Sequence, residues 1–528
     1  MFTKIINNSK RRKCRRPPEA PSQNPPSNEQ MSLSKDLKEN LQSMQKVFEN
    51  ASDVVIREFK IGAEQPVRAF TVMIFGLFNE ASVNENLIKP LMSLDQNIGK
   101  ESAVDIVKES ILPVASVQEY LTLEETVTGI LSGDTALFID GSNRVLMASI
   151  RGWEARGVEE PRTESVVRGP REGFVESLGT NISLIRRKIK NANLKVEMMT
   201  VGKQTKTEIS LVYLHGIANE KIVQEVKDRI SRIETDSVLE SGYIESFIED
   251  APYSLFPTVG NSEKPDITCA KLLEGRVAIL TDGTPFVLTV PYLFVEAFQN
   301  SEDYYSRPYL ATCIRWLRWL AFFISTFIPA LYVAITTYHQ ELLPTSLLVS
   351  IASANEGSPF PTIVEALLMQ IAYEILREAG LRLPKAVGQA VSIVGALVIG
   401  DAAVSAGLVG APMVVVVALT GISSFVVPAL TDVTTVTRFV LLILSSFSGM
   451  YGLMLGFAGF LTHQLSLRSF GVPYMSPLVP LSTSGLKDVI IRAPWWSMGF
   501  RPRNLGKNST RQAESLIPQP PMDSHNNN

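Results

Sequence analysis

Few residues of this sequence suit an enzyme or a metal site. In 528 residues there are three cysteines and four histidines, and they are scattered along the chain. Scattered cysteines provide neither a disulfide framework nor the spacing of a zinc site. His215 is the single histidine before residue 339, and it lies inside a strand-like apolar run rather than beside a nucleophile. We therefore expect no enzyme activity, no bound metal and no cofactor.

A large excess of charge of either sign is also lacking. The 50 Lys and Arg residues nearly balance the 53 Asp and Glu residues, which argues against a nucleic acid as partner. The mean hydropathy of +0.12 averages two unlike parts. Residues 31–306 have the composition of a soluble protein, whereas long stretches between Trp319 and Leu465 carry almost no charge. This contrast predicts a soluble domain followed by a membrane domain.

The N-terminus lacks an apolar segment of the kind that directs secretion. Residues 4–16 hold seven basic residues, and Pro-rich sequence rather than an apolar core follows them. We therefore predict a disordered tail over residues 1–30 and a cytoplasmic location for the large N-terminal domain. Two interpretations of the basic cluster remain open: a contact with anionic membrane lipid, or a tail that only improves solubility.

An internal repeat divides the soluble part into two modules. Four residues recur 140 positions later: Gly62, Gly76, Asn79 and Glu80 return as Gly202, Gly216, Asn219 and Glu220. The Asp-Gly pair at 140–141 returns at 282–283, each time between two strand-like runs. Asp-Gly accepts the positive φ of a tight hairpin turn, so both stretches predict strand, turn and strand. We predict two α/β modules of similar plan, over roughly 45–150 and 190–292.

Four apolar stretches are long enough to cross a bilayer, whose core of about 30 Å takes about 20 helical residues. They cover residues 319–338, 386–409, 412–430 and 439–462. In the last stretch, Gly452 and Gly456 have the small-xxx-small spacing that lets helices pack closely. These four spans form the predicted helical transmembrane domain.

Residues 345–380 are apolar but interrupted by polar residues, glycine and prolines. Irregular backbone at membrane depth is tolerated only where protein or water covers it. The segment is therefore a broken or re-entrant helix that lines a cavity, or an element lying at the membrane surface. Basic residues flank both ends of the membrane domain, which places both ends inside and favours four spans. Arg377, Arg382 and Lys385 would then lie outside, and this conflict stays open.

Acidic residues in the apolar stretches are the best functional candidates, because a carboxylate facing lipid is costly. Glu365 and Asp401 should face protein, water or a pore, although Asp401 alone is better explained by a hydrogen bond to a neighbouring helix. Carboxylates along a path favour cations. The candidate pore-lining residues are Asn355, Glu356, Pro359, Pro361, Glu365 and Asp401.

Three stretches of the chain resemble the A subunit of the GerA-type spore germinant receptors. They are PREGFVESLGTNISLIRRKI, DGTPFVLTVPYLFVEAFQNSEDYY and the long run that begins PFPTIVEALLMQIAYEILREAG. The resemblance extends over about residues 45–500. It implies a subunit that works with a transporter-like B subunit and a lipoprotein C subunit in the spore inner membrane. It also implies nutrient sensing and ion release, with the nutrient pocket usually assigned to the B subunit.

We therefore expect a membrane subunit that forms an oligomeric, ligand-gated channel for monovalent cations and that contacts membrane lipid. A non-conducting scaffold is the alternative, and a secondary transporter is weakened because no inverted repeat is visible. The fold class expected is two similar α/β modules forming a soluble domain, then an α-helical transmembrane domain. The expected boundaries are 1–30 for the tail, 31–155 for the first module, 156–306 for a connecting segment, a helix and the second module, 307–465 for the transmembrane domain and 466–528 for a cytoplasmic tail that is disordered at its end.

Overall fold

The computed structural model describes residues 33–62, 66–94, 103–110, 117–152, 161, 164, 166–382, 400–481, 485–502, 505–507 and 510–511. The predicted tail over residues 1–30 lies outside the described residues, as does most of the expected span 386–409. The chain divides into two compact units. One contains residues 54–152 with the segment before Phe48, and the other contains residues 48–53 and everything from Trp153 onward.

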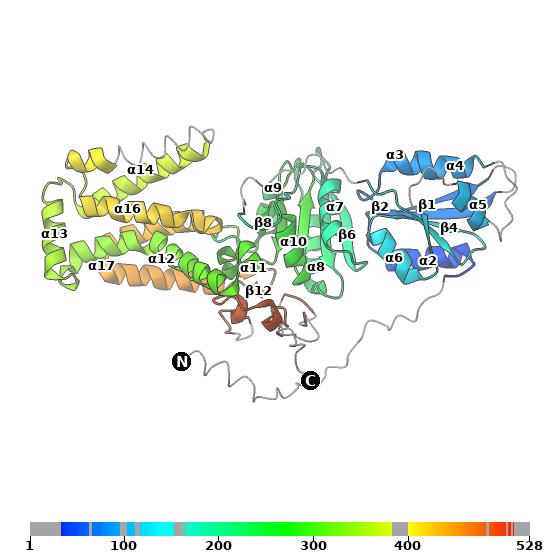
Figure 1. Cartoon of the computed structure of the whole chain (residues 1–528). Helices are drawn as coiled ribbons and strands as arrows, with labels where there is room; N and C mark the ends of the chain where they lie inside the picture. The colour runs from blue at the N-terminus through cyan, green and yellow to red at the C-terminus, as the bar shows by residue number, and fades with distance from the viewer. Residues whose placement is uncertain are drawn as a thin grey trace, which may run out of the picture. The chain divides into compact units, whose positions relative to one another are not determined.

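The first unit is a five-stranded antiparallel sheet with helices on both faces (Figure 1). Its core joins the strands to the helices that follow β2, with Val83, Leu87 and Val104 among the fully buried side chains. In sheet order the strands are β1 (Val54–Ile61), β2 (Val67–Ile74), β4 (Thr135–Ile139), β5 (Val145–Ala148) and β3 (Val117–Tyr120). The helices are α2 (Leu37–Val47), α3 (Glu80–Val83), η2 (Asn84–Ile88), α4 (Lys89–Met92), α5 (Ala103–Ser110) and α6 (Leu123–Leu131).

The second α/β module, which belongs to the other unit, has the same strand order. Its strands are β6 (Leu194–Val201), β7 (Thr207–Leu214), β9 (Val277–Thr281), β10 (Val287–Val290) and β8 (Gly260–Ser262). Its helices are α7 (Leu178–Lys188), α8 (Glu220–Ser231), α9 (Ser241–Ile248) and α10 (Pro265–Leu273). The Asp53 carboxylate binds the Arg186 guanidinium inside this unit with two hydrogen bonds of 2.7 and 2.8 Å.

The repeat predicted from glycine spacing is confirmed by the backbone. Gly62 and Gly202 end the first strands of the two modules with φ of 84° and 94°. Gly141 and Gly283 occupy the two Asp-Gly turns with φ of 86° and 87°. These left-handed conformations strain any residue with a Cβ, so the glycines recur because each module makes the same turns.

The helical domain follows η3 (Phe294–Phe298) and α11 (Glu302–Tyr305). Its elements are α12 (Pro308–Tyr338), η4 (Gln340–Leu342), α13 (Thr345–Asn355), α14 (Thr362–Arg382), α16 (Ala411–Ser424), η5 (Pro428–Leu430) and α17 (Thr431–Ser466). Its core includes Val333 of α12, Ala366 of α14, Met413 of α16 and Leu442 of α17. The long helices lie side by side, whereas α13 crosses their ends and has no buried residue (Figure 1).

α17 is a hairpin of two helical halves rather than one long rod. Gly449, with φ 58° and ψ −135°, breaks it between residues 431–448 and 450–466. The halves then fold back on each other, because a Cβ at Gly456 would lie 2.4 Å from Leu441 Cδ2, fifteen positions earlier. A Cβ at Gly452 would lie 2.1 Å from the Leu444 carbonyl oxygen. The two glycines with small-xxx-small spacing therefore lie where the halves of α17 touch.

The two ends of the helical domain have different surroundings. At one end, which we call the near end, Phe322, Leu430 and Leu467 share a core with Phe294 and Phe298 of the second module. At the opposite end, which we call the far end, the Tyr338 hydroxyl donates to the Ser446 carbonyl oxygen at 2.6 Å, beside the bend at Gly449. The near end is therefore continuous with the soluble module, and the far end is not.

After α17 the chain returns to the second module. Residues 468–473 form the hairpin of β11 (Arg468–Ser469) and β12 (Val472–Pro473), followed later by η6 (Leu486–Asp488) and η7 (Trp495–Ser497). Phe470 and Val472 belong to the core under β6 and β7. The stretch expected as a tail from residue 466 thus contributes to the second module, and the helical domain is inserted between two parts of that module. The structure confirms the predicted fold class of two α/β modules and a helical domain.

Candidate functional site in the helical domain

Polar side chains gather on α14 inside an otherwise apolar domain. Glu365, in the first turn of α14, is 2% exposed, and the Gly410 backbone N–H donates to its Oε2 at 3.4 Å. A buried carboxylate in an apolar bundle needs such partners, because an unpaired charge there is costly. This bond brings the start of α14 against the residue that precedes α16.

Two further polar groups complete this arrangement at the far end. Asn355 is the last residue of α13, and its Oδ1 is buried with no hydrogen-bond partner among the described residues. The Tyr332 hydroxyl on α12 is also buried, and it lies close enough to interact with the Asn355 side chain and with Glu365. Gly410 lies directly against Asn355, since a Cβ on it would be 2.1 Å from Asn355 Oδ1. We call Tyr332, Asn355, Glu365 and Gly410 the far cluster.

A second group of polar residues lies toward the near end, on α14 and α17. Arg438 is fully buried and donates to Gln370 Oε1 at 2.8 Å and to Glu374 Oε1 at 3.4 Å. Arg377 pairs with the other oxygen of Glu374 at 2.7 Å and donates to the Thr435 hydroxyl at 3.2 Å. We call these five residues the near cluster.

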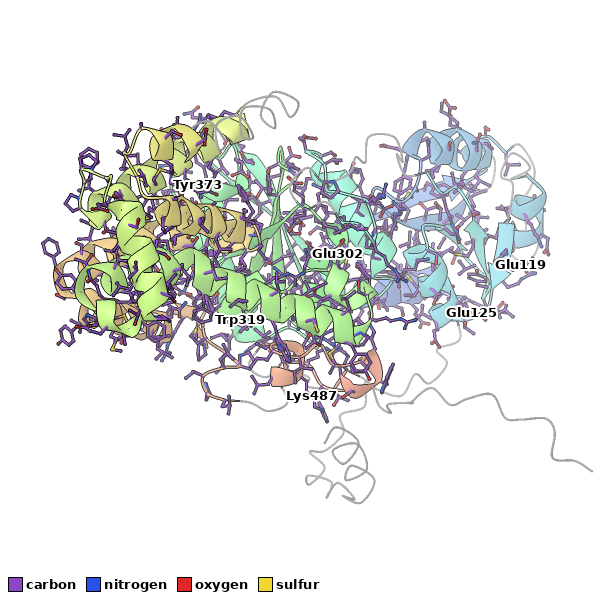
Figure 2. All side chains as sticks on the ribbon, turned by 60° about the vertical axis from the view of Figure 1, so that its left-hand side comes forward. Glu119, Glu125, Glu302, Trp319, Tyr373 and Lys487 are labelled. Carbon is purple, nitrogen blue, oxygen red and sulfur yellow. The ribbon has the colours of Figure 1, made fainter. Side chains whose placement is uncertain are left out.

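Tyr373, which is labelled in Figure 2, lies on α14 between Gln370 and Arg377 of the near cluster. Its hydroxyl donates to the Gly421 carbonyl oxygen at 3.1 Å, and a Cβ at Gly421 would lie 2.5 Å from the tyrosine ring. The absence of a side chain at Gly421 therefore lets α14 and α16 pack closely at this level.

The near cluster carries more positive than negative charge. Two guanidinium groups, of Arg377 and Arg438, share the single carboxylate of Glu374. The Nε atoms of both arginines and the Gln370 amide nitrogen are buried without a partner among the described residues. An excess of buried positive charge repels cations strongly, because the surrounding apolar protein screens it poorly. The near cluster therefore holds an excess of buried positive charge inside the bundle.

The structure brings together only two of the six candidate pore-lining residues. Asn355 and Glu365 meet in the far cluster, whereas Glu356, Pro359 and Pro361 are exposed in the turn between α13 and α14. Asp401 is also exposed, in the helical stretch that precedes α16. The side chains of the last four therefore face outward from this subunit.

Sequence reasoning missed Tyr332, Gln370 and Arg438. Tyr332 stands in an apolar run where a tyrosine is ordinary, and Gln370 carries no charge. Arg438 directly precedes the charge-free run 439–462, so the sequence pattern places it at the boundary of a span rather than inside one. The apolar helix already begins before Arg438, because Val433 and Thr434 are part of it. This earlier start is the signal that could have predicted a buried position for Arg438.

A third group of charges joins the second module to α12. Asp303 is 2% exposed and accepts hydrogen bonds from Arg315 Nε at 2.9 Å and Arg318 Nη1 at 2.7 Å. Arg315 also bonds the Asp488 carboxylate at 3.2 Å, and the Tyr304 hydroxyl donates to the same carboxylate at 3.0 Å. Burial raises the pKa of both Asp488 and Tyr304. This joint fixes the first turns of α12 to the module and to the chain after α17.

The described residues contain no group of three or more His, Cys, Asp or Glu side chains arranged to hold a metal ion. Cys269 is buried, and burial raises the pKa of its thiol to about 12, so it stays protonated and unreactive near neutral pH. Among the described helices, Pro308–Tyr338 and the stretch Pro428–Ser466 are long and apolar enough to cross a membrane. The polar groups of the far and near clusters are carboxylate, amide, hydroxyl and guanidinium groups.

Comparison with known proteins identifies relatives over most of the chain. The family described as Bacillus/Clostridium GerA spore germination protein matches residues 42–504. Spore germination protein KA of Bacillus subtilis (strain 168) is 49% identical over 491 residues, which are 92% of this chain and 90% of that protein. Spore germination protein GerLA of Bacillus cereus is 38% identical over 457 residues, which are 86% of this chain and 92% of that protein.

The similarity extends to a solved structure. It is the crystal structure of the N-terminal domain of the A subunit of the Bacillus megaterium spore germinant receptor GerK3. The identity is 39%, the TM-score is 0.41, and the alignment covers 50% of this chain and 97% of that one. The family match includes both modules and the helical domain, whose long apolar helices indicate a membrane protein. The chain belongs to the Bacillus/Clostridium GerA family of spore germination proteins.

Proposed function

We propose that the chain is the membrane subunit of a nutrient germinant receptor and that several copies form a ligand-gated channel for monovalent cations. The family supports a role in spore germination. The observation that carries the channel proposal is the far cluster, in which a buried carboxylate lies beside the buried polar atoms of Tyr332 and Asn355 inside an apolar bundle. Polar groups at membrane depth usually mark a path for ions or solutes.

The proposed topology is multi-pass, with the soluble modules on the spore-core side of the inner membrane. Both ends of the helical domain join the second module, which supports an even number of crossings. α14 has 21 residues, or about 31 Å, which matches the bilayer core. It runs from the far cluster to Arg377, which contacts Thr435 at the near end. The basic end of α14 then lies inside, as the positive-inside rule requires.

The proposed path follows α14. Exposed Glu356 and Asp401 attract cations at the far end, Glu365 accepts them next, and the near cluster blocks them in the closed state. A nutrient bound by a transporter-like B subunit shifts the population toward an open state. The joint at Asp303 and Arg315 provides a mechanical link between the second module and α12.

The proposed partners are that B subunit, a lipoprotein C subunit, membrane lipid and further copies of this chain. α13 supports the oligomer, because this uncharged, mostly apolar helix has no buried residue within one subunit. A second copy could cover it without desolvating a charge, since its side chains carry none.

The test is cation flux through the purified full chain in liposomes, alone and with its partner subunits. Glu365→Gln keeps the size of the side chain and removes its charge, so it should lower cation selectivity severalfold. Glu378→Gln is the matched control, because Glu378 is an exposed carboxylate on the same helix that pairs with Arg382. Unchanged flux and selectivity in Glu365→Gln, with normal assembly, would overturn the assignment of the path.

The alternative is a scaffold that couples the receptor to other germination components without conducting ions. The buried contacts of Arg438 with Gln370 and Glu374 favour it, because such contacts also stabilise a permanently closed bundle. Absence of cation flux under every combination of subunits and nutrients, together with normal assembly, would support the scaffold.

A further inference from the structure

The chain beyond α17 packs along the first turns of α12 and leaves large apolar side chains uncovered. The Trp316 indole N–H donates to the Ile490 carbonyl oxygen at 3.0 Å, and the Arg492 backbone N–H donates to the Thr312 hydroxyl at 3.1 Å. These bonds hold residues 490–492 against one face of the helix. The exposed side chains of this surface are Tyr309, Trp316, Leu320, Ile490, Ile491 and Trp496.

The exposed charges on the two segments that form this surface are of one sign. Within residues 307–320 and 485–497, the exposed charged side chains are Arg307 and Lys487, both basic. The acidic residue Asp488 is turned inward, where it bonds Tyr304 and Arg315. Figure 2 shows Lys487 in the segment below α12, on which Trp319 is labelled. Exposed aromatic and aliphatic groups flanked by basic residues are typical of the lipid headgroup region.

The length of α12 places this surface at the level of the headgroups. The helix has 31 residues, about 46 Å, which exceeds the bilayer core of about 30 Å. If the core begins at Trp319, Trp316 lies about 4.5 Å outside it, within a headgroup layer of roughly 5–7 Å. Trp319 itself stacks on Phe298 of the second module, with ring centroids 3.7 Å apart, so the module begins at the same level.

We propose that the segment around residues 487–496 and the first turns of α12 form a membrane-anchoring site for anionic phospholipid. Trp316, Ile491 and Trp496 insert among the headgroups, and Arg307 and Lys487 bind lipid phosphates. The site rests on the proposed membrane placement of the helical domain. In this proposal the segment after α17 attaches the second module to the bilayer, which goes beyond the role of a cytoplasmic tail.

The test uses spin labels on the full chain in lipid nanodiscs. Ile491→Cys is labelled after Cys14→Ser and Cys313→Ser, while Cys269 stays because it is buried. Ile422→Cys on the exposed surface of α16 reports lipid, and Lys203→Cys in the β6–β7 turn reports water. In discs containing phosphatidylglycerol, the label at 491 should be more accessible to oxygen than the label at 203 and less accessible to a water-soluble nickel chelate.

Lys487→Gln combined with Arg307→Gln should move the 491 label toward the aqueous values, and phosphatidylcholine discs should do the same. A label at 491 that behaves like the one at 203 overturns the anchoring site, even when the 422 label reports lipid. A 422 label that reports water instead overturns the membrane placement itself. Protection of the 491 label from both reagents would overturn the site too, because protein would then cover this surface. If the accessibility of the 491 label changes neither in the Lys487→Gln, Arg307→Gln variant nor in phosphatidylcholine discs, the preference for anionic lipid is wrong.

Discussion

Asp303 binds two arginines of α12 at once, so its removal leaves the fully buried Arg315 with Asp488 as its remaining carboxylate partner among the described residues. Removing one member of a buried ion pair costs about 3–5 kcal/mol, because the remaining charge stays desolvated. Asp303→Ala should therefore lower the free energy of unfolding of the full chain in detergent by about that amount. Denaturant unfolding followed by tryptophan fluorescence measures it, since Trp316 and Trp319 lie at this joint.

The matched control is Glu378→Ala. Glu378 pairs with Arg382 at 2.6 Å, but both side chains are more than half exposed. Such pairs contribute about 0–1 kcal/mol, so the control should change stability little. Equal losses in the two variants would show that the joint at Asp303 does not hold α12 to the module.

The carboxyl group of Glu245 on α9 should make the stability of the folded state depend on pH. Burial, together with Glu249 and Glu240, raises its pKa from 4.5 to about 7. The folded state therefore holds this proton more tightly than the unfolded chain, and stability falls as pH rises from about 4.5 to about 7. Glu245→Gln should be more stable than the natural protein at pH 8, on the order of 1–2 kcal/mol for a partly exposed group.

The advantage of Glu245→Gln should shrink at pH 5, where the carboxyl group is largely protonated. Limited proteolysis of the full chain at both pH values, with cleavage sites mapped near α9, measures the difference. Glu234→Gln is the control, because Glu234 is 83% exposed and pairs only loosely with Lys203 at 3.8 Å. A gain in stability that is the same at pH 5 and pH 8 would contradict the titration of Glu245.

Among the elements, the α17 hairpin depends on two close glycine contacts. Gly452→Ala puts a Cβ against the Leu444 carbonyl oxygen, which cannot move without unwinding the first half of the helix. Gly459 lies on the same half of α17, and no atom lies within 4 Å of the place that an alanine methyl would take there. Alanine in a helix is ordinarily more favourable than glycine by about 1 kcal/mol. Gly452→Ala should therefore lower the melting temperature, and Gly459→Ala should leave it unchanged or raise it.

Thermal unfolding of the two variants in the same detergent compares them directly. A stabilised Gly452→Ala would mean that the two halves of α17 are not in contact. The fold-back itself is hidden in the sequence, because Gly449 looks like any other glycine in a membrane helix. The sequence therefore predicts one span over 439–462 where the structure has two helical halves.

The α/β modules could be predicted better than the helical domain for a physical reason. Gly62 and Gly141 and their counterparts are required by turns that involve only neighbouring residues, so local sequence carries the information. Arg438 and Gln370 are 68 residues apart and meet only through tertiary packing. Glu365 could be selected from its charge alone, whereas its neighbours Tyr332 and Gly410 could not.

On the scale of the whole molecule, the membrane topology depends on whether α14 crosses the bilayer. If α14 crosses the membrane, Glu356→Cys and Arg382→Cys react with a membrane-impermeant thiol reagent from opposite sides of the bilayer. If residues 345–380 are re-entrant, as the sequence alone favours, both positions react from one side. Oriented vesicles carrying the Cys14→Ser and Cys313→Ser background give this measurement, with Lys203→Cys reporting the side of the soluble modules.

The insertion of the helical domain into the second module also has a consequence for the order of synthesis. Phe470 and Val472 complete the core under β6 and β7. The ribosome adds them to the chain only after it has synthesised the whole helical domain. Until the last helix of this domain has been synthesised, part of that apolar core has no cover. The protein therefore cannot fold strictly one domain after another, and the second module is completed only after the helical domain has been synthesised.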